Sequence, residues 1–355
     1  MGRPSQGPKG SPDVGPGSRR MDPKQYRVRP FVDADYAALS RFRAITSPEL
    51  PSTPEEERAW DSAMAAPHLV NEKWVVEERE TRAVVGLAAL NHSPFSYEPH
   101  HFWASVTVDP AHRGRGIGRA LSALLESEAV SHHAARFWTT VRKDNPMGLE
   151  FARKQGYVEL RTMWMSTLDL SAVEVPSPSE DVGALVLEGV RFTTLAEEGA
   201  ARPEVRRHLF DLISEASKDV PQMGEYTPIS FEQFVRQLES PQVLPEAYFL
   251  ARYGEAYVAM SNLERDMAQP DSLMVAFTGT RPAYRGRGIA TELKRRGLEY
   301  AHRHRIRYLR TFNDSLNLPI GSINEKLGFR RTVEWAHLER RFPPEGAAAS
   351  SGPVP

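Results

Sequence analysis

The chain carries one motif twice. "DPAHRGRGIGRAL" begins at Asp109 and "RPAYRGRGIATEL" begins at Arg281, an offset of 281 − 109 = 172 residues. The same offset aligns further identical pairs, namely Thr139 with Thr311, Asn145 with Asn317 and Lys154 with Lys326. This period is too long for a solenoid unit and suits duplication of a whole domain. We therefore expect two related domains in one chain.

Composition suggests where these domains begin and end. Residues 1–23 and 344–355 are dense in Gly, Pro, Ser or Ala, which predicts two disordered tails. Residues 171–189 contain "VPSPSED", and such a run of prolines, serines and acids is typical of a linker. The predicted domains are therefore residues 24–170 and 190–343.

The order of elements within each copy predicts the fold class. Residues 72–80 and 81–92 are typical of two antiparallel strands joined by a tight turn, and "FWASVTV" alternates as a half-buried strand does. The glycine-rich motif follows this strand, and after it Ile117, Leu121 and Leu125 share one helical face. A strand, a helix and closing strands complete the copy. This order predicts a mixed α/β (α+β) fold with a mostly antiparallel sheet, and neither a barrel nor a doubly wound sheet.

Charge and cysteine content exclude several classes of function. The 45 Lys and Arg residues balance 46 Asp and Glu residues, so the chain lacks the global positive field expected of a nucleic-acid binder. The absence of cysteine excludes disulfides, thiolate metal ligands and a cysteine nucleophile. Apolar runs such as residues 84–90 are far shorter than the ~20 residues of a membrane helix. With no apolar signal core at the N-terminus, we expect a cytoplasmic protein.

The repeated R-G-R-G loop has three possible nucleotide-related interpretations. It lacks the Gly-Lys-Ser/Thr ending of a P-loop, and its glycines are not spaced as in a dinucleotide fingerprint. It also joins a strand to a helix, unlike low-complexity RGG segments. Glycines at such a junction allow several N–H groups to converge beside the positive end of a helix, and arginines add charge-assisted bonds. This pattern predicts a pyrophosphate site; the alternative is a plain glycine-rich turn with solvated arginines.

The loop and its surroundings resemble a known family. Arg-x-x-Gly-x-Gly/Ala after a strand, then a helix, a strand and an Asn followed by Gly-Tyr or Gly-Phe, is similar to the GCN5-related N-acetyltransferases (GNAT), and both halves carry it. The tandem arrangement resembles that of the mycothiol synthases. The resemblance implies two GNAT-like domains, each with a splayed strand pair and flanking helices. It also implies acetyl-CoA as the acyl donor and no metal.

In this family the strand and loop bind acetyl-CoA, and a backbone N–H polarises the thioester carbonyl. The resemblance therefore assigns the pantetheine arm to the preceding strand and the pyrophosphate to the loop, with an Asn at the next helix contacting the arm. In the first half these residues are Val106, Val108, Arg113, Gly114, Arg115, Gly116, Ile117, Gly118 and Asn145. In the second half they are Thr278, Thr280, Arg285, Gly286, Arg287, Gly288, Ile289, Ala290 and Asn317.

The sequence departs from the family at the usual general acid. Many members carry a tyrosine seven residues after the Asn, but here those positions hold Ala152 (145 + 7) and Asn324 (317 + 7). Asn324 can still donate a hydrogen bond to the sulfur or the pantetheine, or it can simply be a helix residue that faces solvent or caps a neighbour. Because the second half also offers Asn313 and Asn317, we expect the second domain to be the active one.

The acceptor site is expected where the first helices of a domain meet its open sheet. In the second half that region contains Asp219, Glu225 and Tyr226, which can hold and orient a cationic amine, or form only a polar surface loop. Asp219, Glu225 and Glu264 are all candidates for the general base. The expected reaction is direct attack of a small-molecule primary amine, such as a thiol-precursor or aminoglycoside-like amine, in a ternary complex.

One alternative function stays open. The missing tyrosines also suit a catalytically silent acyl-CoA-binding module that acts as a sensor or scaffold. In either case the partners expected are a small molecule, and neither nucleic acid nor a membrane. Two related domains in one chain mimic a dimer, so we expect a monomer.

Overall fold

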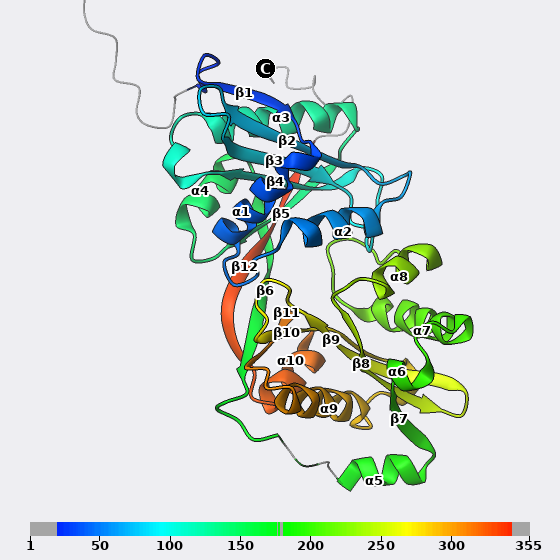
Figure 1. The fold of residues 1–355 in the computed structure, drawn as a ribbon. Helices are drawn as coiled ribbons and strands as arrows, with labels where there is room; N and C mark the ends of the chain where they lie inside the picture. The colour runs from blue at the N-terminus through cyan, green and yellow to red at the C-terminus, as the bar shows by residue number, and fades with distance from the viewer. Residues whose placement is uncertain (1–19, 176, 178–179, 343–355) are drawn as a thin grey trace, which may run out of the picture.

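A single β-sheet runs through the whole molecule. The computed structural model describes residues 20–175, 177 and 180–342, so most of the predicted tails, residues 1–19 and 343–355, lies outside the described residues. Twelve strands form this sheet in the order β1-β2-β3-β4-β5-β12-β6-β11-β10-β9-β8-β7. Figure 1 shows one half of the chain above and the other below, with β6 and β12 running between them.

The two halves contain similar series of elements. The first half has β1 (Tyr26–Pro30), a 3-10 turn (Asp33–Asp35), α1 (Tyr36–Thr46), α2 (Pro54–Met64), β2 (Asn71–Glu78), β3 (Val84–Asn91), β4 (His101–Val108), a 3-10 turn (Pro110–His112), α3 (Ile117–Ser131), β5 (Arg136–Arg142), α4 (Pro146–Lys154) and β6 (Val158–Asp169). The second half has α5 (Glu180–Leu187), β7 (Val190–Thr194), α6 (Leu195–Glu198), α7 (Pro203–Ala216), a 3-10 turn (Ser217–Asp219), α8 (Phe231–Leu238), β8 (Val243–Tyr253), β9 (Ala256–Arg265), β10 (Ser272–Thr280), a 3-10 turn (Pro282–Tyr284), α9 (Ile289–Arg303), β11 (Tyr308–Asp314), α10 (Leu318–Lys326) and β12 (Arg330–Arg341).

The closing strand of each half is exchanged with the other half. β6 pairs antiparallel with β11 of the second half, and β12 pairs antiparallel with β5 of the first half. β6 and β12 also pair with each other, which joins the two halves into one sheet. The sequence predicts the mixed, mostly antiparallel sheet and the two-domain organisation, and both are confirmed. The exchange of the closing strands was not predicted, and it joins the sheets of the two domains into one.

Each half contains the splayed strand pair that the family resemblance implies. β4 and β5 pair in parallel only from His101↔Arg136 to Trp103↔Trp138, although both strands continue beyond that point. β10 and β11 likewise pair only from Ser272↔Tyr308 to Met274↔Arg310. Near the glycine-rich loop, β4 is therefore no longer paired with β5, and β10 is no longer paired with β11, although β4 and β10 still pair with β3 and β9.

Two segments differ from the sequence-based expectation. Residues 171–189, predicted as a linker, include the helix α5, whose Leu185 is buried in the core of the second half. At the N-terminus, Met21 packs against the core of the first half although the tail was expected to reach residue 23. Apolar side chains in otherwise polar segments account for both differences. The domain boundaries themselves stay predictions.

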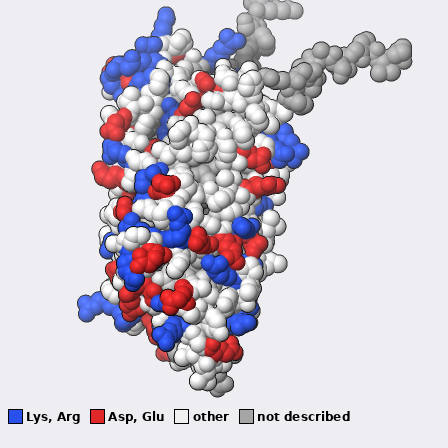
Figure 2. Space-filling model, turned by 90° about the vertical axis from the view of Figure 1, so that its right-hand side faces the viewer, with Lys and Arg blue, Asp and Glu red and all other residues white. Residues whose placement is uncertain are grey.

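The surface shows no large area of a single charge on the face drawn in Figure 2. Blue and red side chains alternate over its lower part, and a broad area of the upper part carries neither. This agrees with the near-zero net charge of the chain. Within the described residues, the helices are too short or too polar to cross a membrane.

The exchanged strand β12 predicts a shared stability for the two halves. Leu338 belongs to the second half by sequence but packs with Ala152 in the first half's core. Leu338→Ala should lower the free energy of unfolding by about 2–5 kcal/mol, the usual cost of a Leu→Ala cavity. Urea unfolding followed by tryptophan fluorescence should show one shifted transition. The control Leu187→Ala, at a position 89% exposed, should leave the unfolding transition at the wild-type urea concentration. A Leu338→Ala protein with a second, unshifted transition would show that the two halves unfold independently.

Candidate active site

The two glycine-rich loops have the same backbone. The first two glycines of each loop adopt positive φ, with Gly114 at 76° and Gly116 at 81°, and Gly286 at 75° and Gly288 at 78°. Gly116 and Gly288 are the left-handed N-caps of α3 and α9, with no side chain over the first turn of either helix. Residues with a Cβ rarely adopt this conformation. Both loops therefore present open helix N-termini, as an anionic phosphate requires.

The first arginine of each loop anchors it to the preceding strand. Arg113 donates from Nε to the carbonyl of Val108 (3.3 Å), and Arg285 donates from Nε to the carbonyl of Thr280 (3.0 Å). This shared bond explains why an arginine stands at the start of both loops.

The arginines of the two loops differ in their other partners. Arg115 donates to the hydroxyl of Tyr26 (2.8 Å). In the second half, Arg285 forms an ion pair with Asp219 (2.6 Å) and Arg287 forms one with Glu188 (3.5 Å). All four side chains of these ion pairs are more than 40% exposed, and such pairs contribute ~0–1 kcal/mol. Phosphate oxygens can therefore replace the carboxylates at little cost.

A groove leads from the first loop into the splayed strands of the first half. One cavity of about 600 Å³ is lined by the residues proposed to bind the cofactor, all except Arg115, namely Val106, Val108, Arg113, Gly114, Gly116, Ile117, Gly118 and Asn145. A second cavity of about 730 Å³ shares Val106, Arg113 and Asn145 with it and extends between β4 and β5. The structure thus brings the first-half candidates together along one path.

The second half fills the corresponding space with larger side chains. Ser122, Val141 and Ala152 line the first-half groove. The residues 172 positions later, at the equivalent places in the second half, are Lys294, Asn313 and Asn324. The Asn324 side chain donates to the side-chain oxygen Oδ1 of Asn313 (2.6 Å), and the Asn313 side chain donates to the Ser166 hydroxyl (2.9 Å). Asn324 is only 1% exposed. It therefore lies in a buried polar cluster, and its proposed hydrogen bond to the donor stays a prediction.

Lys294 is the most unusual member of this buried region. Its side chain is 3% exposed and its ammonium lies 5.7 Å from the centre of the Phe329 ring. Burial lowers the pKa of Lys294 to about 7. Sequence analysis missed this residue. The available signal was a lysine next to Leu293, on the part of α9 that faces the sheet.

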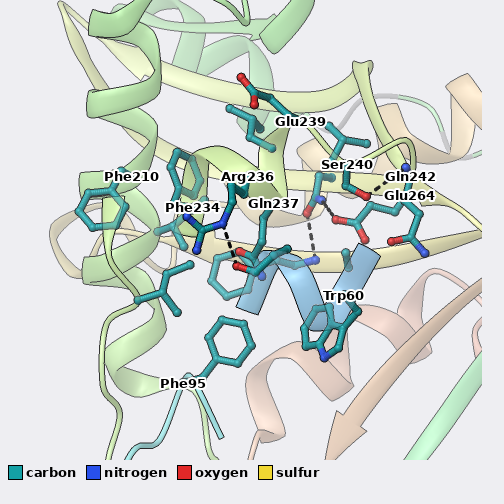
Figure 3. A pocket seen from close by; sticks show the side chains of 18 of the residues that line it. Trp60, Phe95, Phe210, Phe234, Arg236, Gln237, Glu239, Ser240, Gln242 and Glu264 are labelled. Atoms are coloured by element: carbon teal, nitrogen blue, oxygen red, sulfur yellow. Dashed lines mark hydrogen bonds between the residues drawn. The ribbon is translucent and has the colours of Figure 1, made fainter. Parts of the chain in front are cut away.

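A third cavity, of about 660 Å³, lies between the halves. Figure 3 shows Trp60 of α2 and Phe95 of the first half beside Phe210, Phe234 and Glu264 of the second half. Of the predicted acceptor residues, Tyr226 lines this cavity. Asp219 pairs with Arg285 of the loop instead, and Glu225 is exposed. The contribution of Trp60 and Phe95 was missed because no local pattern indicates that the two halves meet there.

A β-bulge positions the carboxylate of this cavity. The register of β10 against β9 shifts between Val275 and Phe277. The side chain of Asn262 bridges the irregularity by accepting from the Phe277 N–H (3.0 Å) and donating to the Glu264 carboxylate (3.0 Å). Burial raises the pKa of Glu264, against the opposing effect of the Asn262 hydrogen bond. The bulge and Asn262 thus hold Glu264 at the cavity, and burial moves its pKa from the ordinary glutamate range toward neutral pH.

The first half has no matching arrangement at the equivalent positions. β3 and β4 pair without a register shift from Gly86↔Val108 to Asn91↔Trp103. The offset places Leu90 at the position of Asn262 (262 − 172) and His92 at that of Glu264 (264 − 172). His92 accepts from the Val70 N–H (2.9 Å) and stacks on Phe102, so it is a packing residue. The bulge and its carboxylate distinguish the second half.

Comparison with known proteins identifies the family. Residues 37–157 and 210–329 both match the model of the Acetyltransferase (GNAT) family. The chain belongs to this family. It is therefore an acetyltransferase with two GNAT domains, and the family uses an acyl-CoA donor.

Sequence relatives of this GNAT protein are mycothiol acetyltransferases. The protein from Thermobispora bispora is 27% identical over 231 residues, covering 64% of this chain and 72% of the relative. That from Cellulomonas flavigena is 24% identical over 333 residues, covering 92% and 90%. Among solved structures, a tandem GNAT protein from the clavulanic acid biosynthesis pathway aligns with a TM-score of 0.68 at 19% identity, covering 90% of this chain and 99% of that protein. These likenesses confirm the tandem organisation and a distant homology to mycothiol acetyltransferases.

One group of metal-type ligands lies elsewhere in the described part of the GNAT protein. Atoms of Glu72, Glu128 and His132 lie within 4.8 Å of one another. The Nε2 atom of His132 lies 3.2 Å from the Glu72 carboxylate, within hydrogen-bond distance. The expectation of a metal-free acetyltransferase stays a prediction.

Lys294 gives the GNAT protein a pH-dependent stability. Between the folded-state pKa of about 7 and the ordinary lysine pKa of 10.5, the unfolded chain binds the extra proton, so the free energy of unfolding rises with pH. Lys294→Met should remove up to about 1.4 kcal/mol per pH unit of this slope. Urea unfolding at pH 7 and pH 9 measures it, with exposed Lys326→Met as the control. An unchanged slope in Lys294→Met would show that the buried amine is not the cause.

Proposed function

We propose that this protein transfers an acetyl group from acetyl-CoA to a primary amine of a small molecule, and that the second domain is the active one. The observation that carries the proposal is Glu264, held by Asn262 beside the bulge of β10 in the cavity between the halves. The alternative bases, Asp219 and Glu225, lie at the loop and at the surface. Acetyl-CoA would then approach Glu264 from β10, and the amine would approach it from the cavity between the halves.

Each part of the second domain has a role in holding the donor. The loop of Arg285, Gly286, Arg287, Gly288, Ile289 and Ala290 would bind the pyrophosphate, and the strand of Thr278 and Thr280 would hydrogen-bond the pantetheine arm. Asn145 accepts from the Gly148 N–H as a helix cap (3.0 Å). Asn317, among the described residues, makes no such cap bond, so its amide is available to the donor.

Glu264 would prepare the amine for attack. Acetyl-CoA supplies the acetyl group as a thioester. Glu264 takes a proton from the ammonium, directly or through one water, and a carboxylate with a raised pKa does so more effectively near neutral pH. The amine nitrogen then bonds to the carbonyl carbon as the carbon–sulfur bond breaks, and the thiolate takes up a proton. A backbone N–H at the bulge of β10 would polarise the carbonyl oxygen.

The first domain suits the second candidate function, silent binding of an acyl-CoA. Its loop and its groove between β4 and β5 are open, whereas Leu90 and His92 replace the catalytic pair of the second domain. We therefore propose a division of labour. The first domain binds the cofactor without turnover or supports the second, which carries out the transfer.

Replacing the base should affect the chemistry more than the fold. Glu264→Gln keeps the hydrogen bond from Asn262 but cannot accept a proton, so kcat/KM should fall at least about a hundredfold. The rise of kcat/KM with pH on the acidic side should also disappear. Glu225→Gln, at an exposed position, is the matched control and should retain activity. A large loss in Glu225→Gln with wild-type behaviour in Glu264→Gln would assign the base to the loop instead.

The two loops should respond differently to mutation. Arg285→Gln should raise the KM for acetyl-CoA about tenfold by removing a charge-assisted bond to phosphate, whereas Arg113→Gln should leave turnover largely intact. Calorimetry with acetyl-CoA, together with a free-thiol assay over an amine panel, separates binding from transfer. Equal loss of turnover in both variants would refute the division of labour. Binding without thiol release from any amine would favour the sensor.

A further inference from the structure

The cavity between the halves has an aromatic wall that both halves build. Trp60 and Phe95 come from the first half, and Phe210, Phe234 and Phe277 come from the second. Trp60 is 49% exposed, an unusual position for a tryptophan in the otherwise charged helix α2. Its ring centre lies 6.4 Å from that of Phe95. Figure 3 shows Trp60, Phe95, Phe210 and Phe234 among the side chains that line this cavity together with Glu264.

The polar side chains of the wall are largely engaged with the protein itself. Arg236 donates to the carbonyls of Ala63 (3.3 Å) and Ala65 (3.2 Å), which ties α8 to the end of α2. Gln242 donates to the carboxylate of Glu56 across the same interface (3.0 Å). These contacts close the cavity, but they occupy the hydrogen-bond donors of Arg236 and Gln242, which the hydroxyl groups of a ligand would otherwise need. Hydroxyls buried there lose their water without gaining a partner.

The two carboxylates that line the cavity differ in whether they have a partner of opposite charge. Glu239 forms an ion pair with Arg206 (2.8 Å). Among the described residues, the neutral amide of Asn262 is the one hydrogen-bond partner of the Glu264 carboxylate, so the charge of Glu264 is uncompensated when it is ionised. A cationic ammonium is the ligand group that compensates it. The cavity thus combines one carboxylate without an ion-pair partner with aromatic and apolar surface and with neutral polar side chains such as Gln222 and Tyr226.

We infer that the acceptor of the second domain is a primary amine on an apolar, preferably aromatic, body, and that the first domain supplies part of its binding site. This inference rests on the function proposed above and specifies its substrate class. The ammonium would lie at Glu264, and the body would lie between Trp60, Phe95 and the phenylalanines of α7 and α8. A volume of about 660 Å³ is in the range of pockets for small molecules, about 300–1,000 Å³.

This acceptor differs from the thiol-precursor and aminoglycoside-like amines that sequence analysis considered. Those molecules present many hydroxyl groups, whereas the wall gains from burying apolar surface. Aromatic rings also attract a cationic amine through their faces. The shape and chemistry of the cavity therefore favour arylalkylamines such as phenethylamine or tryptamine over amino sugars.

A comparison of amines tests the inference on the full-length protein. With saturating acetyl-CoA and a free-thiol readout, kcat/KM for tryptamine and phenethylamine should exceed that for glucosamine and kanamycin at least about tenfold. Trp60→Ala and Phe95→Ala should raise the KM for tryptamine about tenfold or more, as loss of an aromatic anchor does, and leave the KM for acetyl-CoA unchanged. Val130→Ala, at an exposed position on α3, is the control.

The outcomes separate this inference from the proposed function. Turnover with a preference for the amino sugars, or Trp60→Ala and Phe95→Ala enzymes that behave as wild type, would overturn the inference while the transferase function stands. If no amine releases CoA, the proposed function fails, and calorimetry of phenethylamine with the CoA-saturated protein decides the inference alone. Binding that Trp60→Ala weakens supports it, and absence of binding overturns it.

Discussion

The pairing of β6 with β12 is the interaction on which the rest of the structure depends. β6 lies between β11 and β12, and β12 lies between β6 and β5, so neither half can complete its sheet without the other. The exchange also determines which helices of the two halves are in contact. The exchange brings α2 of the first half against α8 of the second, and this contact closes the cavity that contains Glu264. The two halves of the duplicated chain thus line one cavity together.

The halves have diverged within this shared frame. Both keep the glycine-rich loop, because the backbone angles at Gly114, Gly116, Gly286 and Gly288 are set by local geometry. The splayed strands then differ in what fills them. The first half has an open groove beside Ser122 and Ala152, and the second has the buried Lys294 and Asn324. The proposed division of labour rests on other matched positions, Asn262 and Glu264 in the second half against Leu90 and His92 in the first.

Sequence reasoning succeeded where the determinants are local or repeated. The 172-residue period revealed two domains, and the strand–loop–helix order gave the family and the splayed sheet. It could not reveal the exchanged strands, because β6 and β12 have the same alternation whichever half they join. Glu264 was one of three predicted candidates for the general base, and the sequence could not rank them. The features that distinguish Glu264, the β-bulge and the hydrogen bond from the Asn262 side chain, exist only in the folded structure. Trp60 and Phe95 were missed for the same reason, since they act across an interface.

The central claim is that acetyl transfer takes place in the second domain, between β10 and Glu264. The most direct measurement is a crystal structure of the full-length protein with CoA and phenethylamine bound. The account predicts the CoA pyrophosphate at the loop of Arg285 and the CoA sulfur beside the bulge of β10, with the amine nitrogen within hydrogen-bond reach of Glu264, directly or through one water. An amine bound beside β4 and β5 of the first domain, with the cavity at Glu264 free of both ligands, would contradict it.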